Sequence, residues 1–113
     1  MKSLLTVDIA HPPLDEREAC AALDEALRRI RNSKTLRVMK IIHGYGALGV
    51  PAEQKEIVEE WLADNRGKYI SYIDGEELIS TSSKVQVLLA ECDIPETNDF
   101  KYPNGEITIV WVT

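Results

Sequence analysis

The chain contains little cysteine, glycine and proline, and it has no long run of apolar residues. Its 113 residues include two cysteines, six glycines and five prolines. No run approaches the ~18 apolar residues of a membrane span, and residues 1–6 lack the apolar region and cleavage site of a signal peptide. Cys20 and Cys92 do not have the spacing of metal ligands. We therefore expect two reduced structural thiols in a cytoplasmic protein that does not enter a membrane.

The remaining composition is that of an ordinary globular protein. Apolar residues make up 44% of the chain and charged residues 28%. A chain of this length can bury one core without disulfides or a metal. The sequence therefore predicts a single domain over residues 1–113.

Acidic side chains are missing from one segment of this acidic chain. The net charge of −6, taken alone, argues against nucleic-acid binding. Residues 26–52, however, contain no Asp or Glu, whereas they carry several basic side chains. These are Arg28, Arg29, Arg31, Lys34, Arg37 and Lys40. A local basic field can concentrate a polyanion even on an acidic protein. The alternative is that Arg28 and Arg29 pair with Asp24 and Glu25 along one helix, and that the other cations are merely solvated.

Hydrophobic periodicity indicates alternating strands and helices. Asp15, with Glu18 three residues later, is typical of a capping box at a helix start, and an apolar stripe with helical spacing follows it. Strands are expected at 3–9, 35–42, 68–73 and 107–112, and helices at 16–31, 50–64 and, shorter, 84–91. This order predicts an α/β fold, a two-layer sandwich with a four-stranded, mostly parallel or mixed sheet. Residues 75–103 are expected to be an added segment.

The ends of the first two predicted strands carry the residues best suited to chemistry. An apolar β-branched run leads into His43 and a glycine-rich loop at 44–49, where the next helix N-terminus favours an anion. A right-handed βαβ unit places the carboxyl ends of both strands at one sheet edge, where ligands collect. We therefore expect Asp8 and His11 to meet His43 there. A histidine can transfer protons near neutral pH, and Asp8 can orient it or bind a metal.

The same loop also matches the dinucleotide fingerprint G-x-G-x-x-G at Gly44, Gly46 and Gly49. Pro51 suggests that the helix begins after the third glycine, whereas that motif needs this glycine inside the helix–sheet packing. The acid at the end of the next strand, Asp74, is thirty residues beyond Gly44, instead of the usual ~20. A dinucleotide site is therefore a minor alternative.

The two strand ends resemble the motifs of the small MutS-related (Smr) domain family. In that family, Leu-Asp-Leu-His-Gly ends the first strand and His-Gly-x-Gly ends the second. Here His43-Gly44-Tyr45-Gly46 matches the second motif. Val7-Asp8-Ile9 matches the opening of the first, and Ala10-His11-Pro12 replaces its His-Gly. The resemblance covers roughly residues 4–73 and 104–112.

The resemblance implies nucleic-acid binding and, as in several members, nicking or endonuclease activity on DNA or RNA. Asp8, His11 and His43 would then be catalytic, with Mg²⁺ or Mn²⁺ as an optional cofactor. The residues expected to bind nucleic acid are Lys40, Gly44, Tyr45, Gly46, Gly49, Arg28, Arg29 and Arg37. The competing interpretation is a non-catalytic adaptor that binds a protein or a ribosomal surface and keeps only the fold.

Several of these residues also have an ordinary structural interpretation. His43 could simply cap the end of its strand, and His11 could be an exposed turn residue. Tyr45 could stack on a base or pack on its own loop. Trp61 lies on the apolar side of its helix and is expected in the core, whereas Trp111 could face the core or the open side of the sheet.

Overall fold

The structure is a computed structural model that describes residues 3–45, 53–94 and 98–113. Four strands alternate with three α-helices, and 3₁₀ turns at Gly75–Glu77 and Asn98–Phe100 flank the third helix. In chain order the elements are β1 (Leu4–Asp8), α1 (Glu16–Arg31), β2 (Val38–Ile42), α2 (Glu53–Asp64), β3 (Ser71–Asp74), α3 (Ser83–Cys92) and β4 (Ile107–Trp111).

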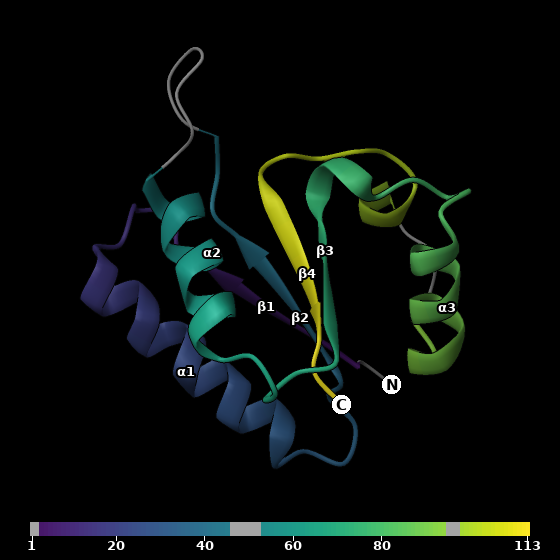
Figure 1. The fold of residues 1–113 in the computed structure, drawn as a ribbon, viewed down its shortest axis with the longest axis horizontal. Helices are drawn as coiled ribbons and strands as arrows, with labels where there is room; N and C mark the ends of the chain where they lie inside the picture. Colours follow the sequence, from purple (N-terminus) through teal and green to yellow (C-terminus); the bar gives the residue numbers. More distant parts are fainter. Residues whose placement is uncertain (1–2, 46–52, 95–97) are drawn as a thin grey trace.

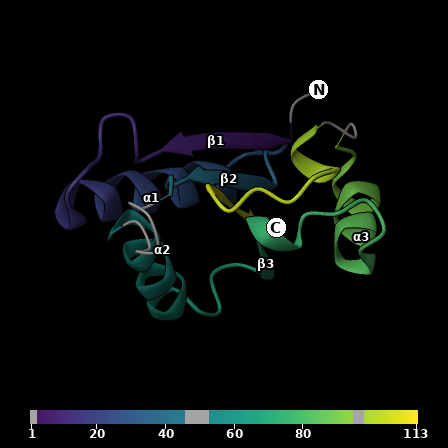
Figure 2. The same cartoon turned by 90° about the horizontal axis from the view of Figure 1, so that it is seen from above.

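The sheet has the strand order β1-β2-β4-β3. β1 pairs with β2 in parallel, and β4 lies antiparallel between β2 and β3. Consequently β1, β2 and β3 all run in one direction, and their carboxyl ends share one edge of the sheet. Figure 2 shows β1 and β3 as the two outer strands, with α1 and α2 on one face and α3 on the other. The predicted α/β class and the mixed four-stranded sheet are confirmed.

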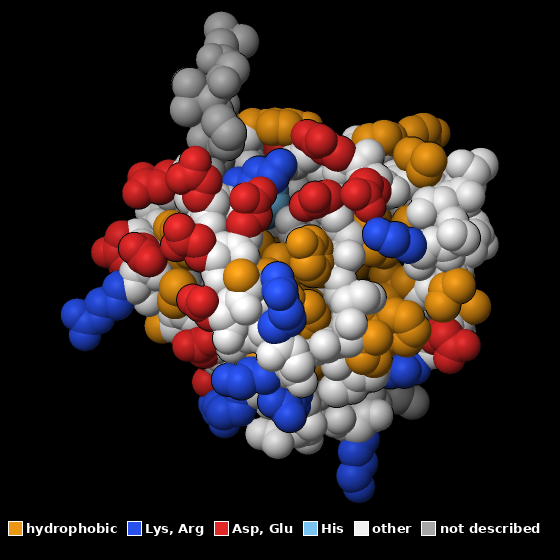
Figure 3. All heavy atoms as spheres, in the orientation of Figure 1, with side chains coloured by type: hydrophobic (Ala, Val, Ile, Leu, Met, Phe, Trp, Pro, Cys, Tyr) orange, Lys and Arg blue, Asp and Glu red, His pale blue; other side chains and the backbone are white. Residues whose placement is uncertain are grey.

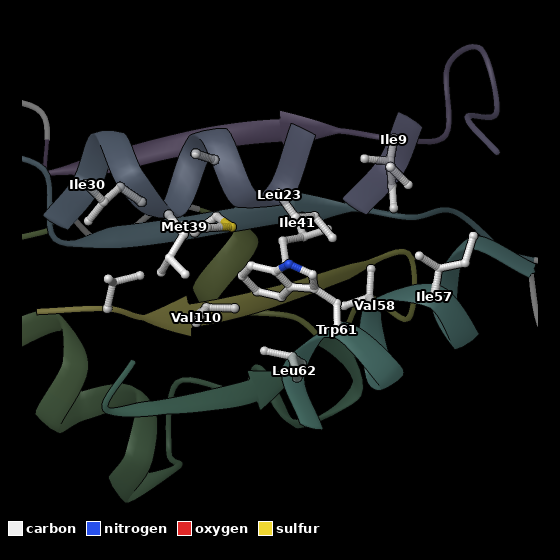
Figure 4. Close-up of a cluster of buried hydrophobic side chains, with 14 residues drawn as sticks. Ile9, Leu23, Ile30, Met39, Ile41, Ile57, Val58, Trp61, Leu62 and Val110 are labelled. Atoms are coloured by element: carbon white, nitrogen blue, oxygen red, sulfur yellow. The ribbon is translucent and has the colours of Figure 1, made fainter. Parts of the chain in front are cut away.

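The first face of the sheet packs against α1 and α2 (Figure 1). Alternate residues of a strand point to opposite faces, and Met39, Ile41 and Val110 point to this one. Leu23 of α1 and Trp61 of α2 complete the layer, and the Trp61 indole lies between the helix and the sheet (Figure 4). Trp61 is 3% exposed, so its predicted place in the core is confirmed.

The second face of the sheet is covered by the segment expected as an addition. Val38 and Ile109, which alternate with the residues of the first face, contact a separate apolar cluster. Leu78, Leu88 and Phe100 from the segment after β3 are almost fully buried in it. Trp111 packs against this cluster as well. The segment after β3 therefore builds a second core beside the predicted sandwich.

Local signals at the helix ends agree with the sequence. The Asp15 carboxylate accepts a hydrogen bond from the Glu18 backbone N–H at 2.8 Å, and the Glu18 carboxylate accepts one from the Asp15 N–H at 3.5 Å. The predicted capping box of α1 is therefore present. None of the helices within the described ranges is long and apolar enough to cross a membrane.

The third strand begins later than predicted, at Ser71 instead of residue 68. Gly67 adopts φ +93°, a left-handed conformation that glycine reaches without strain. The Lys68 N–H then donates to the Asn65 carbonyl at 3.0 Å. This turn at the end of α2 uses the residues that the hydrophobic pattern assigned to the strand.

Candidate functional site

The two strand ends that carry the predicted motifs lie side by side at the carboxyl edge. The Ile9 N–H donates to the Ile42 carbonyl at 3.0 Å, which extends the pairing of β1 with β2. Gly44 has φ +72°, and a Cβ added there would lie 3.4 Å from the Ala10 Cβ. A side chain on Gly44 would only touch the β1 turn, but this φ is one that residues other than glycine rarely adopt. The backbones meet as the topology predicted.

Asp8 and His11 form a pair on this edge. Asp8 Oδ1 accepts hydrogen bonds from the Ala10 N–H at 2.8 Å and the His11 N–H at 3.1 Å, and Asp8 Oδ2 lies 3.0 Å from His11 Nδ1. Burial acts against ionisation of Asp8, but these hydrogen bonds and the nearby imidazole outweigh it and hold its pKa below the usual 3.8. The side chains are 36% and 65% exposed. The carboxylate therefore orients the histidine, as expected, in an exposed turn.

His43 lies in the protein interior, with only 1% of its surface exposed. Its Nδ1 is 3.1 Å from the Gly44 carbonyl oxygen, and its Nε2 is 2.9 Å from the Thr108 hydroxyl. Because a carbonyl only accepts, Nδ1 carries the proton, and Nε2 of the neutral ring accepts from Thr108. Burial lowers the pKa of His43 below 6.5. The imidazole is therefore neutral, and both of its nitrogens are already hydrogen-bonded within the protein.

The sheet places this histidine and the Asp8–His11 pair on opposite faces. Asp8 is in register with Ile42, which packs against the second-face cluster. The next residue, His43, points the other way, toward Thr108 on the first face. The predicted constellation is thus assembled in its backbone, but its side chains form an exposed pair on one side and a buried histidine on the other.

Tyr45 packs against the loop before β4. Its hydroxyl accepts a hydrogen bond from the Gly105 N–H at 2.9 Å, and a Cβ added at Gly105 would lie 2.5 Å from the Tyr45 ring. Glycine at 105 is therefore needed for the ring to approach. Tyr45 still exposes 65% of its surface. Gly46, Gly49 and the expected anion position between them lie outside the described residues.

Three of the basic residues predicted to bind nucleic acid are engaged within the protein. The Lys40 ammonium pairs with the Asp99 carboxylate at 2.8 Å and is 18% exposed. Arg37 donates to the Thr113 carbonyl at 2.8 Å and also to the Glu91 carbonyl, which joins α3 to the end of β4. Arg28 pairs with Glu25 on the exposed side of α1. Lys40 and Arg37 therefore have structural roles.

A basic hollow that the sequence only partly indicated lies at the opposite, amino edge of the parallel strands. α1 and α2 both start at the carboxyl edge and run back, so their last turns meet at the amino edge. A hollow of about 720 Å³ opens between these ends. Its lining consists of Cys20, Asp24, Leu27, Arg28, Arg31, Asn32, Trp61, Asp64, Asn65 and Lys68. Lys68 was not among the predicted site residues. The predicted lengths of the two helices could have indicated it, because both helices end at the same edge and Lys68 follows the second one, near Arg28.

This arrangement separates two groups of residues that the sequence interpretation joined in one surface. α1 has 16 residues and is therefore roughly 24 Å long at 1.5 Å per residue. Arg28 and Arg29 are at its far end, away from Gly44 and Tyr45. The fold therefore does not form one continuous surface that includes both groups.

The thiols and carboxylates do not form a metal site within the described ranges, where no group of three or more His, Cys, Asp or Glu side chains comes together. Asp8 and His11 are two candidate ligand residues, one fewer than such a group needs. Both cysteines are free. Burial, together with nearby carboxylates such as Glu16, raises the pKa of Cys20 above 9.0, which keeps it a thiol.

No protein-family model, curated protein or solved structure matches this chain. The likeness to Smr domains therefore rests on the motif residues at the ends of β1 and β2.

Proposed function

We propose that this protein binds nucleic acid through the basic amino edge of its sheet, by contacts to phosphate. The observation that carries this proposal is the convergence of three cations on one hollow, which Arg28 and Arg31 line from α1 and Lys68 lines from the turn after α2. Two carboxylates, Asp24 and Asp64, line it as well. Asn32 is in the same lining, and side-chain amides are common partners of phosphate and sugar oxygens. The Asn65 amide, in contrast, donates to the Trp61 carbonyl at 2.8 Å.

Two of these cations, Arg31 and Lys68, form no ion pair with the described residues, whereas Arg28 pairs with Glu25. Within residues 3–45, 53–94 and 98–113, four ion pairs occur, and they involve His11, Arg28, Lys40 and Lys84. No described carboxylate lies within 4.0 Å of the charged nitrogens of Arg29, Arg31, Lys34, Arg66 or Lys68. Displacement of counterions by such cations is the main source of affinity for a phosphate backbone.

Charge is also distributed unevenly along α1, with acidic residues at its start and basic residues at its end. Glu16 and Glu18 lie in the first turn of α1, whereas Arg28, Arg29 and Arg31 lie in its last turn. Cations in a last turn also stabilise the helix dipole, and this does not remove their charge from the surface. In Figure 3, Lys and Arg side chains gather at the lower ends of α1 and α2, and Asp and Glu side chains gather above them. A polyanion would therefore approach from the amino edge.

The proposal covers binding and does not extend to cleavage. His43, the residue expected to transfer a proton, is buried with both nitrogens engaged. Asp8 and His11 lie on the other face of the sheet, at the edge away from the basic hollow.

The test is binding of labelled single- and double-stranded DNA and RNA, measured by fluorescence anisotropy at several salt concentrations. Arg31→Gln with Lys68→Gln should weaken binding by about tenfold at low salt and reduce the slope of log K against log salt by about two. Arg17→Gln with Lys55→Gln removes the same charge from the opposite ends of the same helices and is the matched control. Equal losses in both double variants, or an affinity that does not depend on salt, would contradict the proposal.

A further inference from the structure

The outer edge of β3 is an open strand edge at the bottom of a trough. Within the described residues β3 pairs only with β4, and no backbone hydrogen bond from outside that ladder reaches residues 71–74. In an antiparallel pair, alternate residues direct their N–H and C=O groups away from the partner strand. β3 therefore presents unpaired backbone groups outward, as edge strands do.

Hollows lie on both sides of this edge. One, of about 320 Å³, lies between the sheet and α3, and its apolar lining includes Ile73, Val87, Leu88, Ile109 and Trp111. The other, of about 420 Å³, follows the outside of the strand from Arg66 to Glu77. Figures 1 and 2 show α2 and α3 flanking β3 from opposite faces. A strand laid on this edge would have room for its side chains on both faces.

Three exposed side chains beside this strand edge are large and apolar. Ile70 is 58% exposed, Tyr72 45% and Val87 50%. Ile70 and Tyr72 line the outer hollow, and Val87 lines the cavity beside α3. Burying such side chains would stabilise a complex by about 25 cal/mol for each Å² removed from water. The strand contains no proline, and its one charged residue, Asp74, lies at its carboxyl end.

The charge along the trough reverses from one end to the other. Arg66 lies at the amino end of β3, whereas Asp74 and Glu77 lie at its carboxyl end, and all three line the outer hollow. Lys84 lines it as well and pairs with Glu77 at 3.7 Å, so Asp74 is the acid at that end without an ion pair among the described residues. In Figure 3 most acidic side chains of this face lie above and several basic ones gather below, with hydrophobic side chains between them, although single basic side chains also lie near the acidic ones. An antiparallel strand would place its N-terminal part at the acidic end and its C-terminal part at the basic end.

We propose that this trough binds an extended peptide of a partner protein as a fifth, antiparallel strand on β3. The peptide has basic residues first, a large apolar residue in the middle and acidic residues last. Its backbone pairs with the open edge of β3, and its central side chain enters the cavity beside Val87. Strand addition of this kind takes affinity from main-chain hydrogen bonds and specificity from the pockets for alternate side chains. The site is independent of the basic hollow between α1 and α2.

The first experiment uses two synthetic peptides of identical composition, Lys-Lys-Val-Phe-Val-Thr-Asp-Glu and its reversed sequence, with blocked ends. Binding is followed by calorimetry. The peptide with basic residues first should bind about tenfold more tightly than the reversed one. Equal binding of the two peptides, or no binding of either, would overturn the proposal.

The second experiment tests strand pairing itself. Two versions of the tighter peptide are N-methylated at alternate residues, so that each loses the hydrogen-bonding groups of one peptide edge only. One version should lose at least tenfold in affinity and the other should bind nearly as before, and the β3 amides should become protected from hydrogen exchange. Equal binding of both versions would overturn strand addition. Protection of the β3 amides by raising the protein concentration alone would show that a second copy occupies the edge.

Two variants of α3 test whether the central side chain of the peptide enters the cavity beside Val87. Val87→Asp puts a charge into the apolar lining from an exposed position and should weaken peptide binding about tenfold. Ala90→Asp introduces the same charge on the same helix, at an exposed position outside that lining, and should leave binding unchanged. Peptide binding that both variants weaken equally would contradict the cavity assignment. Neither variant touches the cations of the basic hollow, so failure here would leave the nucleic-acid proposal standing.

Discussion

The two ends of the parallel strands differ in how many of their polar side chains are already hydrogen-bonded or ion-paired within the protein. At the carboxyl edge, Asp8 is satisfied by the turn that follows it, and His43 by Gly44 and Thr108. At the amino edge, Arg31 and Lys68 face a hollow and have no described carboxylate within ion-pairing distance. A motif at the carboxyl edge marks where ligands bind in many α/β proteins. Here, however, the groups left available to a ligand lie mainly at the opposite end.

The physical reason for the difference is the alternation of side chains along β1 and β2. Asp8 and His43 leave neighbouring strands at nearly the same height, but one residue of offset in register directs them to opposite faces. The amino edge has no such constraint, because its cations are on helix ends and can all point outward. Long side chains at helix ends can therefore reach a common point more easily than side chains at strand ends, where an offset of one residue reverses the face to which a side chain points.

The largest expected effect concerns the buried bond between His43 and Thr108. Thr108→Val removes the hydroxyl, leaves Nε2 of His43 without a donor in the interior and should destabilise the protein by about 1–3 kcal/mol. For a domain of 113 residues this corresponds to a fall in Tm of roughly 4 °C for each kcal/mol. Thr108→Ser keeps the hydroxyl and is the control, to be compared by thermal and urea unfolding. A Thr108→Val protein as stable as Thr108→Ser would mean that this bond contributes nothing.

The second effect is a loss of stability on mild acidification. Burial lowers the pKa of His43 below 6.5 in the folded state, so the unfolded chain binds the proton more readily. This contribution to stability is complete above about pH 6.5 and is lost as the pH falls below that value, by up to about 1.4 kcal/mol for each pH unit until the folded pKa is reached.

Urea unfolding between pH 4 and 7 measures this slope. His43→Gln should remove it, whereas His11→Gln should not, because His11 is exposed. The lowered pKa of Asp8 affects stability in a different pH range. Its contribution to the free energy of unfolding is present above about pH 3.8 and is lost only as the pH falls below that value. A pH 4–7 slope that His43→Gln leaves unchanged would assign it to other groups.

The third effect, smaller again, concerns the exposed turn after β1. Asp8→Ala removes the acceptor for the Ala10 and His11 N–H groups and should cost about 0.5–1 kcal/mol, because water can replace part of the loss at this exposed site. Asp8→Asn retains a side-chain oxygen that supports such a turn and should cost less. Equal unfolding free energies for the two variants would show that the turn does not depend on this oxygen.

The sequence predicted the order of elements and the meeting of the strand ends well, because both follow from hydrophobic periodicity and the handedness of βαβ units. The capping box at Asp15 and the placement of Trp61 belong to the same class of local signal. The burial of His43 could not be read in advance, since it depends on Thr108, which is 65 residues away in sequence. The role of Lys40 depends likewise on Asp99, in a segment whose packing on the second face had no local pattern.

The smallest expected effect would sharpen the contrast between the two edges. Arg28 is the one cation of the basic hollow whose charge is paired in the described structure, with Glu25 on the solvent side of α1. Such exposed pairs are weak and screened by salt. Glu25→Gln should therefore leave Tm nearly unchanged but release Arg28 toward phosphate, raising nucleic-acid affinity roughly twofold at low salt. Glu18→Gln removes the same charge from the first turn of α1 and should not change the affinity. Anisotropy titrations of the two variants measure the difference, and equal affinities would mean that distance from the hollow does not matter and that net charge alone governs binding.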